Sequence, residues 1–380
     1  MSDSSALPST TAALVSTVTE DGTAFLSIRD EPVAEPGPDQ VVVRIEAAPI
    51  NPSDLGLLFA RGDVGRAEAA EYDGDPALRI PLSAGELATN ASRIGQTMPA
   101  GNEGGGTVVA AGSSEAAQAL LGRVVGFASG NTYAGYRTVP AVTCLAMPDG
   151  VTPEQAAAPF VNPLTALGMV ETMRIDGHSG LVHTVGASNL GLMLNRICLA
   201  DGVPLVNIVR RQEHIDLLRG MGAEHVVDSS AESFRDDLRA ALEATGATIA
   251  FDAIGGGELG STILSTMEQV ASAGAAFSRY GSDVRKQLYI YGGLDRSPTV
   301  LHRNFGFGWS VGGWLLTPFL GQLGTEGTER LRRRVAEEIT TTFASEYGMR
   351  VSLADAIDPE VARRYGKMAT GDKALVVPHA

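Results

Sequence analysis

The sequence predicts an α/β protein with two domains: a strand-rich segment and a doubly wound parallel sheet. A chain of 380 residues is long for a single hydrophobic core. Up to about residue 158 it shows short strands separated by turns, and beyond Pro153 strands and helices alternate. The alternating part contains a glycine turn that follows the apolar run Leu181–Val185 and precedes residues at helical spacing.

Composition and charge exclude several classes of protein. With 44% hydrophobic and 19% charged residues, the chain has the composition of an ordinary soluble globular protein. No apolar run is long enough to span a membrane, and the polar N-terminus shows no secretory signal, so we expect a cytoplasmic protein. Cys144 and Cys198 are too widely spaced for a disulfide framework or a cysteine-rich metal site. The net charge of −15 argues against a general nucleic-acid surface.

The first strands of the chain lead to a rigid corner. Loose alternation over 12–28 predicts a hairpin, and 40–47 predicts a further strand. Two prolines then exclude regular structure from the corner Ala48–Asp54. Its polar residues Asn51 and Asp54 are also common where helices begin, which is the plain structural explanation for them.

The region from 60 to 98 shows a weaker pattern. Its first part is acidic and its remainder is rich in glycine and small residues. We therefore expect a long surface loop, and loops of this length are often lids or binding loops. Short strands are expected after it at 107–111, 121–127 and 136–140, so that the whole segment resembles a partly open barrel.

The stretch Gly186-Ala-Ser-Asn-Leu-Gly191 lies between a predicted buried strand and a predicted helix. Unpaired N–H groups at such a helix start, together with the positive end of the helix dipole, suit a pyrophosphate. Gly186 lets the chain turn, and Gly191 lets the helix pack close to the sheet. The stretch is a spaced variant of the dinucleotide fingerprint, not the full G-x-G-x-x-G.

A second apolar run, Val203–Val209, ends in Arg210 and Arg211. The distance from Gly191 suits one helix and the next strand of a βαβ unit. Enzymes that use NAD usually carry Asp or Glu here to hold the ribose hydroxyls. Guanidinium groups match a phosphate in a bidentate way, so the pair predicts a site for the 2′-phosphate of NADP. Two solvated arginines at a strand end are the alternative.

The remaining elements complete the alternating pattern. Strands are expected at 224–227, 248–252, 288–291 and 373–377, and helices at 163–173, 214–221, 234–242, 260–267 and 331–343.

These residues carry a family resemblance that extends over nearly the whole chain. The chain resembles the medium-chain dehydrogenase/reductase superfamily, and within it the zinc-free quinone reductases and mitochondrial-type enoyl-thioester reductases. The matching motifs occur in the family's order: Asn51-Pro-Ser-Asp54, Gly101-Asn-Glu-Gly104, Val161-Asn-Pro-Leu-Thr-Ala166, Gly186 to Gly191, Asp252-Ala-Ile-Gly-Gly256, Tyr291-Gly-Gly293 and Gly312-Gly-Trp314. The resemblance implies a Rossmann NADP-binding domain at 159–320 and a GroES-like, mostly β catalytic domain formed by 1–158 and 321–380.

The resemblance also predicts that no metal is bound. The positions that hold zinc in the alcohol dehydrogenases correspond to Asn51, Asn102-Glu103 and roughly Asn162. Amide side chains are poor zinc ligands beside thiolate or imidazole, and the histidines show no ligand spacing.

A reductase without zinc must polarise its acceptor by hydrogen bonds. The family places the nicotinamide between the two domains, and the residues implied to line that cleft include Asn51, Asp54, Tyr133, Tyr136 and Trp314. Enoyl reductases carry a proton-donating Tyr shortly after the Asn-Pro-Ser-Asp corner. This sequence has Phe59-Ala-Arg-Gly-Asp63 there instead, and its nearest tyrosine is Tyr72, which is a candidate proton donor or a surface residue.

The family's cofactor positions can be carried over to this sequence. Thr165 is implied at the nicotinamide ribose or phosphates, Ile254 beside the nicotinamide half, and Tyr291 near the adenosine phosphate end. Lys373 is implied near the NADP phosphates; a core tyrosine and a solvated lysine are the alternatives for these last two. The full set of implied contacts is Asn162, Thr165, Gly186, Ala187, Ser188, Asn189, Leu190, Gly191, Arg210, Arg211, Ile254, Tyr291, Gly292, Gly293, Trp314 and Lys373.

The resemblance implies an NADPH-dependent reductase that passes hydride to a small-molecule acceptor, namely the activated C=C of an enone or enoyl thioester, or a quinone. Two alternatives remain. One is a zinc-free alcohol/carbonyl oxidoreductase, and the other is a protein that binds NADPH without turnover, as a sensor or structural protein. Family members commonly form homodimers by pairing the edge strands of their cofactor domains, and Trp309–Leu316 is the matching region.

Overall fold

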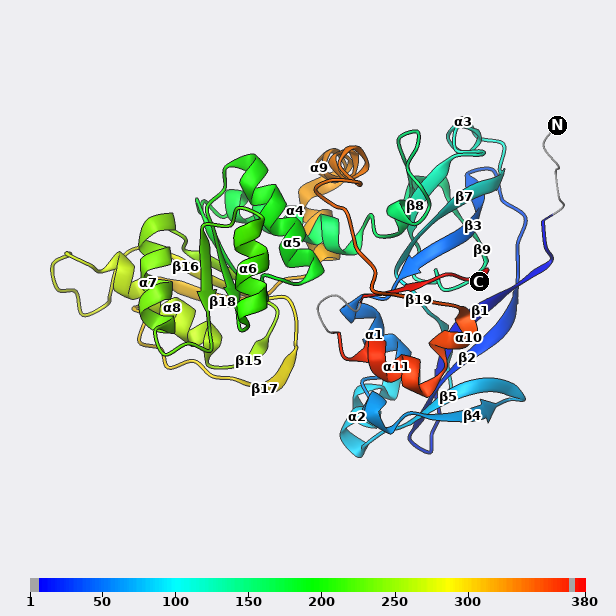
Figure 1. Cartoon of the computed structure of the whole chain (residues 1–380), viewed down its shortest axis with the longest axis horizontal. Helices are drawn as coiled ribbons and strands as arrows, with labels where there is room; N and C mark the ends of the chain where they lie inside the picture. Colours follow the sequence, from blue (N-terminus) through cyan, green and yellow to red (C-terminus); the bar gives the residue numbers. More distant parts are fainter. Residues whose placement is uncertain (1–6, 369–372) are drawn as a thin grey trace. The chain divides into compact units, whose positions relative to one another are not determined.

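The computed structural model describes residues 7–368 and 373–380. Residues 1–6, which are part of the N-terminal segment in which no secretory signal is expected, lie outside the described residues. The chain folds into two compact units, each described by itself below (Figure 1). Unit 1 comprises Met1–Val161 and Arg332–Ala380, and unit 2 comprises Asn162–Leu331.

Unit 1 is built on two sheets. The first runs, with all neighbours antiparallel, in the order β4 (Glu68–Tyr72), β5 (Asp75–Pro81), β2 (Thr23–Pro32), β1 (Thr10–Val18) and β6 (Thr97–Pro99). The second runs in the order β10 (Cys144–Ala146), β8 (Val124–Ala128), β7 (Glu103–Ala111), β3 (Gln40–Pro49), β20 (Ala374–Val376) and β19 (Met349–Val351), with β9 (Tyr136–Pro140) also paired to β3. The strand-rich domain predicted from the sequence is confirmed.

The prediction of a long loop from 60 to 98 is wrong. Strands β4 and β5 form a hairpin that extends the first sheet, and α2 (Ala84–Thr89) and β6 follow it. The segment is held to the rest of unit 1 because the Arg93 guanidinium donates to the carbonyl of Leu57 and to Ser16 Oγ. Strand β4 is an exposed edge strand, so it does not need alternating apolar residues. Its acidic residues therefore give no hydrophobic pattern from which a strand could be predicted.

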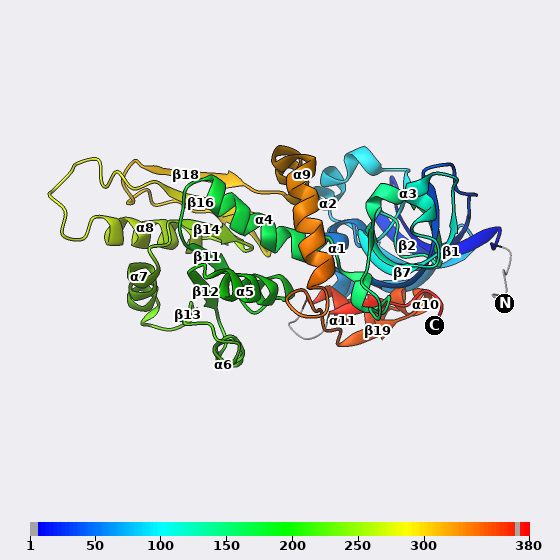
Figure 2. The ribbon, with the colours of Figure 1, turned by 90° about the horizontal axis from the view of Figure 1, so that it is seen from above.

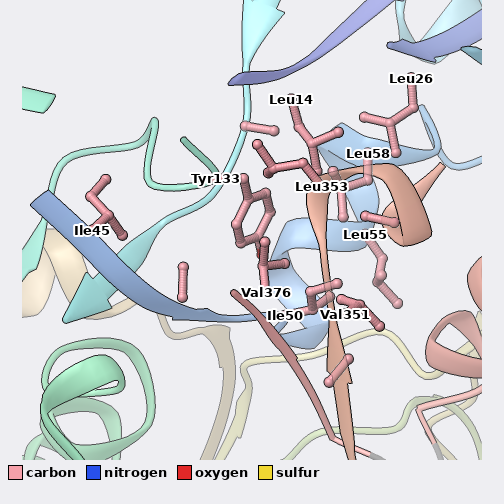
Figure 3. Close-up of a cluster of buried hydrophobic side chains, with 14 of the residues drawn as sticks. Leu14, Leu26, Ile45, Ile50, Leu55, Leu58, Tyr133, Val351, Leu353 and Val376 are labelled. Atoms are coloured by element: carbon pink, nitrogen blue, oxygen red, sulfur yellow. The ribbon is translucent and has the colours of Figure 1, made fainter. Parts of the chain in front are cut away.

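The core of unit 1 is formed by buried side chains from both sheets and from α1 (Pro52–Leu58) (Figure 3). Leu14 from β1, Ile45 from β3 and Leu58 from α1 are all buried there. Val376 from β20 packs in the same cluster, so the last strand of the chain closes the core formed by the first strands.

Unit 2 is a parallel sheet with helices on both faces. Its order is β13 (His225–Asp228), β12 (Leu205–Val209), β11 (Leu181–Thr184), β14 (Ile249–Asp252), β16 (Lys286–Ile290) and β18 (Trp309–Gly313). Helices α7 (Phe234–Thr245) and α8 (Leu259–Ala271) cover one face, and α4 (Val161–Ile175), α5 (Asn189–Asp201) and α6 (Gln212–Gly220) lie on the other (Figures 1 and 2). The chain thus enters the sheet at β11 and proceeds through β12 to β13 at one edge. It then crosses back to β14, beside β11, and continues through β16 to β18 at the other edge. The predicted doubly wound Rossmann sheet is confirmed.

The other elements connect these layers. Helix α9 (Leu316–Glu337) leads from unit 2 back to unit 1 and is interrupted at Gly324, whose φ is 78°. The short pieces are β15 (Gly255–Gly257) paired with β17 (Asp295–Thr299), α3 (Glu115–Gln118), α10 (Leu353–Ala356), α11 (Pro359–Gly366), and the 3₁₀ turns η1 (Val64–Arg66), η2 (Ala91–Arg93), η3 (Ala141–Thr143) and η4 (Gln155–Ala157).

A buried ion pair fixes the start of β16 in unit 2. Lys286 is fully buried, and its Nζ donates to the Glu268 carboxylate of α8, to Ser282 Oγ and to the Val284 carbonyl. Burial acts to raise the pKa of Glu268. Hydrogen bonds from Lys286, Ser272 and Ser282 outweigh that effect and lower this pKa to about 2.

Removing one partner of this pair should destabilise unit 2. We expect Lys286→Met to cost about 3–5 kcal/mol, because it leaves the Glu268 charge without its buried counterion. Urea denaturation measures this. Arg239→Met is the control, since it breaks an exposed pair with Glu243, for which less than about 1 kcal/mol is expected. Equal losses of unfolding free energy in both variants would show that the buried pair stabilises unit 2 no more than an exposed pair does.

Candidate functional site

The corner after β3 holds a buried polar cluster in unit 1. Asn51 precedes α1, and its backbone N–H donates to Asp54 Oδ2 at 2.8 Å. Asn51 Nδ2 donates to Glu103 Oε1 on β7, also at 2.8 Å. The exposed fractions of Asn51, Asp54 and Glu103 are 1%, 3% and 0%. The corner residues predicted from the sequence therefore meet a second carboxyl group from a distant strand.

Glu103 has a hydrogen bond to each of its oxygens. Its Oε2 accepts the backbone N–H groups of Phe160 and Val161, at 2.8 and 2.9 Å. Burial raises the pKa of Glu103, although the charge of Lys373 and these hydrogen bonds oppose the rise. This residue was not predicted as a site residue, even though it belongs to the Gly101–Gly104 motif.

Asp54 and Tyr133 face each other beside this carboxyl. Burial raises the pKa of Asp54 to about 7, with a smaller contribution from the charge of Glu103. Tyr133 is fully buried, and its hydroxyl donates to the Pro49 carbonyl at 3.0 Å. Burial and the nearby charge of Asp54 raise the pKa of Tyr133, so this phenol stays protonated. Near neutral pH, the Asp54 carboxyl is therefore close to its pKa, whereas the pKa of the Tyr133 phenol lies well above that pH.

Lys373 brings an amine to the same cluster. Its Nζ is covered and has no hydrogen-bond partner among the described residues; it lies 5.5 Å from the centre of the Tyr347 ring. Burial lowers the pKa of Lys373 to about 8, against the charges of Glu103 and Asp54, which favour the ammonium form.

Tyr72 lies outside this cluster. It ends β4, where its ring stacks on Phe25 with centroids 4.4 Å apart and lies 5.6 Å from the Arg29 guanidinium carbon. These contacts account for Tyr72 as part of the hairpin. The stretch after the corner that contains no tyrosine, 59–63, begins with Phe59, which is buried and stacks on Tyr365.

Within residues 7–368 and 373–380, no three His, Cys, Asp or Glu side chains are grouped so that they could hold a metal ion. No helix in the described part of the chain combines the length and apolar character needed to cross a bilayer.

In unit 2, the glycine turn joins β11 to α5 as predicted. Ser188 caps α5, and its Oγ accepts the N–H of Gly191 at 3.1 Å. A Cβ on Gly191 would lie 2.2 Å from the Gly186 carbonyl oxygen, and one on Gly186 would lie 2.8 Å from Asn207 Oδ1. No larger residue fits at either position. Val185 begins the turn with φ of 59°, a strained conformation for a β-branched residue.

The two arginines follow β12, the neighbour of β11 in the sheet. Both Arg210 and Arg211 are exposed, and Arg211 pairs with Glu213 at 3.1 Å. For Arg210, no ion pair is found within the described ranges. The cradle of small residues and the exposed guanidinium groups fit the diphosphate and the 2′-phosphate of NADP.

The turn after β14 is anchored to the glycine turn by Asp252. Its Oδ1 accepts hydrogen bonds from the Thr184 hydroxyl and from the N–H of Ile254, both at 2.9 Å. Its Oδ2 accepts a hydrogen bond from the N–H of Gly255. A Cβ on Gly292 would lie 2.5 Å from the Ala253 carbonyl oxygen, so the turns after β14 and β16 are in close contact. Gly293, the next residue, has open space at its Cβ. Asp252 and Thr184 were not predicted as site residues, because a carboxylate that holds backbone leaves no periodic signal.

The side chains of Tyr291 and Trp314 both make polar contacts with other residues of unit 2. Tyr291 Oη lies 2.7 Å from His183 Nε2, and the two rings stack. Burial lowers the pKa of His183 to about 3, so the imidazole is neutral. Trp314 Nε1 donates to Thr172 Oγ1 on α4 at 3.0 Å. Asn162 and Thr165, near the start of α4, are each 7% exposed.

The implied cofactor residues of unit 2 thus share one edge of its sheet. The glycine turn, the arginines, Ile254 and the Tyr291–Gly293 stretch all follow the carboxyl ends of neighbouring parallel strands. This edge is where open α/β sheets bind their ligands.

No protein-family model matches the chain. Curated relatives are found at low identity. The chain is 27% identical over 223 residues to a mycocerosic acid synthase-like polyketide synthase of Mycolicibacterium smegmatis, covering 58% of this chain and 9% of that protein. It is 28% identical over 247 residues to the synaptic vesicle membrane protein VAT-1 homolog of Rattus norvegicus, covering 63% and 53%. The chain therefore spans about half the length of the VAT-1 homolog and a small part of the synthase.

Among solved structures, the chain is similar to a putative NADPH:quinone reductase from Mesorhizobium loti. The TM-score is 0.73 at 27% identity, and the match covers 98% of this chain and 100% of the other. Enoyl reductases and quinone oxidoreductases are further relatives. The fold and the motif order agree with these findings: the quinone oxidoreductases, enoyl reductases and VAT-1 homologs to which the chain is similar are all members of the medium-chain dehydrogenase/reductase superfamily.

Proposed function

We propose that the protein is an NADPH-dependent oxidoreductase that transfers hydride, without a metal, to an activated C=C or to a quinone. The observation that carries the proposal is the glycine turn of unit 2, with Arg210 and Arg211 at the end of the adjacent strand. An alternation of strand and helix alone would support any nucleotide-binding protein. The paired arginines favour, among the possible nucleotides, a dinucleotide that carries a 2′-phosphate.

The cofactor end uses residues of unit 2. The N-terminus of α5 and the small residues before it let backbone N–H groups approach a diphosphate. Arg210 and Arg211 offer bidentate donors to the 2′-phosphate. Bound NADPH would supply the hydride. The names of relatives support this cofactor, since the Mesorhizobium loti protein is called a putative NADPH:quinone reductase.

The acceptor end uses residues of unit 1. Reduction of an enone, enoyl thioester or quinone places negative charge on a carbonyl oxygen, and one well-placed donor lowers such a barrier by about 3–4 kcal/mol. The side chains of Asn51 and Asp54 are the buried polar groups that the corner supplies. Because burial raises the pKa of Asp54 to about 7, this carboxyl can carry a proton near neutral pH.

A protein that binds NADPH without turnover is the second candidate. One observation favours it: the stretch 59–63 after the corner contains no tyrosine that could donate a proton. A zinc-free alcohol/carbonyl oxidoreductase would share the same cofactor site. The choice among these functions depends on unit 1, because all three need the same glycine turn.

A panel of acceptors tests the proposed function. We expect steady oxidation of NADPH with at least one quinone, enone or enoyl thioester, followed as loss of nicotinamide absorbance, and no dependence on added or chelated divalent metal. Tight NADPH binding without turnover of any acceptor would favour the sensor. Turnover with simple aldehydes or ketones alone would favour the carbonyl reductase.

The arginines should set cofactor selectivity. We expect the Arg210→Ala/Arg211→Ala double variant to weaken NADPH binding by about tenfold or more while NADH binding changes little, because two charge-assisted donors to the 2′-phosphate are lost. Isothermal titration with both cofactors measures this. Arg219→Ala, near the end of α6, is the matched control. A parallel loss of NADH affinity would contradict the assignment.

We also propose that the protein is a homodimer joined through β18. This strand lies at the end of the sheet order in unit 2, and Phe307 and Leu315 on either side of it are 78% and 66% exposed. An uncovered strand edge flanked by apolar side chains pairs readily with a second copy.

Light scattering should therefore give twice the chain mass of 39.5 kDa. We expect Leu315→Glu to shift the protein towards the single-chain mass, because a charge would be buried at the interface. Val142→Glu, at a 73% exposed position of unit 1, should leave the mass unchanged. A single-chain mass for the wild type would refute the dimer.

A further inference from the structure

A group of aromatic side chains is exposed on unit 2. The segment 273–285 joins α8 to β16, and in Figures 1 and 2 this yellow-green loop extends beyond the rest of the unit. We call it the aromatic arm, because it carries Phe277 and Tyr280, which are 96% and 58% exposed. Apolar side chains that are clustered at the surface, unlike scattered ones, mark places where another molecule binds.

Hydrogen bonds hold the base of the aromatic arm. The Ser282 N–H and hydroxyl both donate to the Glu268 carboxylate, each at 2.7 Å. The Phe307 N–H donates to the Tyr280 carbonyl at 3.0 Å, and the two rings meet edge to face with centroids 6.1 Å apart. The Arg279 guanidinium carbon lies 4.7 Å from the centre of the Tyr280 ring. A hydrogen-bonded backbone therefore presents these aromatic side chains to the surroundings.

The contact with Phe307 joins the aromatic arm to the open edge of the sheet. Phe307 lies two residues before β18, and β18 has no further strand beside it among the described residues. An open edge presents a row of backbone N–H and C=O groups that another strand can satisfy along its whole length. A second copy of this chain offers such a strand, whereas a lipid surface does not.

The symmetry of such a pair determines which residues meet. A two-fold axis that relates two edge strands makes them antiparallel. Val311 is the middle residue of β18, so an axis beside it pairs the whole strand with its copy. Phe307 and Leu315 lie four residues before and after Val311, and both are exposed. The same axis therefore brings Phe307 of each copy to Leu315 of the partner subunit.

The strand alone is a small contact surface. Stable interfaces bury about 800 Å² on each partner, and β18 has five residues. One aromatic side chain can bury about 150–250 Å². Phe277, Tyr280 and Phe307 can therefore supply a large part of the area that the strand lacks.

We propose that the aromatic arm packs against a second copy of this chain and stabilises a homodimer whose two β18 strands pair about Val311. This inference rests on the homodimer included in the proposed function, and it adds the register of the strands and the surface around them. The axis places the amino end of one β18 beside the carboxyl end of the other. Because the arm leads into the amino end of β16, beside that of β18, it contacts the partner near Leu315 of the partner subunit.

Cysteine cross-linking tests the register. Cys144 and Cys198, the two cysteines of the sequence, are both buried, so a cysteine introduced on β18 supplies the accessible thiol. Directly opposite Cα atoms of an antiparallel pair lie about 4.5–5.5 Å apart, a distance that a disulfide spans. We expect Val311→Cys alone to give a disulfide-linked dimer under mild oxidation, visible on a non-reducing gel.

Phe307→Cys and Leu315→Cys form a matched set for the same test. Neither variant alone should cross-link, because each residue faces a different one across the axis. After subunit exchange, a mixture of the two should give a linked dimer with one chain of each kind. Cross-linking of Leu315→Cys alone would refute the register. A dimeric Val311→Cys protein that does not cross-link would refute it as well.

Sedimentation equilibrium tests the aromatic arm itself. We expect Phe277→Ser to raise the dimer dissociation constant by about tenfold or more, since buried aromatic side chains carry much of the binding free energy of interfaces. Leu217→Ser is the control, because Leu217 is an exposed residue of α6, which packs beside β13 at the opposite edge of the sheet. Equal dissociation constants for the wild type and Phe277→Ser would refute the role of the arm.

The outcomes separate this inference from the proposals on which it rests. A wild type of single-chain mass refutes the homodimer and the arm contact together, whereas a dimer that Phe277→Ser leaves intact refutes the arm contact alone. Vesicles of phosphatidylcholine and phosphatidylserine provide a lipid probe. Sedimentation of a monomeric wild type with them, lost in Phe277→Ser, would overturn the inference in favour of a lipid surface. None of these measurements uses turnover, so they are independent of the reductase activity.

Discussion

The hydrogen bonds of the Glu103 carboxylate are the constraint on which the site in unit 1 depends. One oxygen holds the Asn51 side chain, and the other holds the backbone N–H groups of Phe160 and Val161. The same carboxyl group thus fixes the corner before α1 and the backbone at the start of α4, where the first segment of unit 1 ends. A buried acid in this position is costly unless its oxygens are satisfied, and here backbone and amide donors satisfy both. The Glu103 carboxylate thereby fixes the backbone that surrounds Asp54 and Lys373.

The glycine-rich edge of the sheet in unit 2 depends on close approach between backbone segments. The carbonyl of Gly186 occupies the space that a side chain at 191 would need, and the carbonyl of Ala253 occupies that of a side chain at 292. The end of β11 is linked to the turn after β14 by Thr184. Its hydroxyl donates to the Asp252 carboxylate and accepts the N–H of Ala253. The edge of the sheet where a dinucleotide would lie is therefore assembled from closely packed backbone segments, with Gly186 and Gly191 buried in the glycine turn.

The parts of this protein that could be predicted from its sequence are those with a local cause. The glycine turn and the strands around it follow from an apolar run, two glycines and helical spacing within a few residues. The hairpin within 60–98 was missed because an exposed edge strand such as β4 needs no apolar face. Glu103 was seen only as part of a motif, since burial of a carboxyl group arises from the packing of distant segments. Tyr72 could be named from its residue type as a candidate proton donor or a surface residue, but its stacking on Phe25 could not be seen from spacing.

The path of the chain has a consequence for biosynthesis. Unit 2 is continuous in sequence, whereas unit 1 needs β20 beside β3 to complete its second sheet. A ribosome that has made residue 331 has produced everything that the parallel sheet requires, but the first 161 residues still lack their closing strand. The nascent N-terminal strands must therefore wait, with an open sheet edge, while the inserted unit folds. The covered lysine at 373 reaches its place only in the last step of assembly.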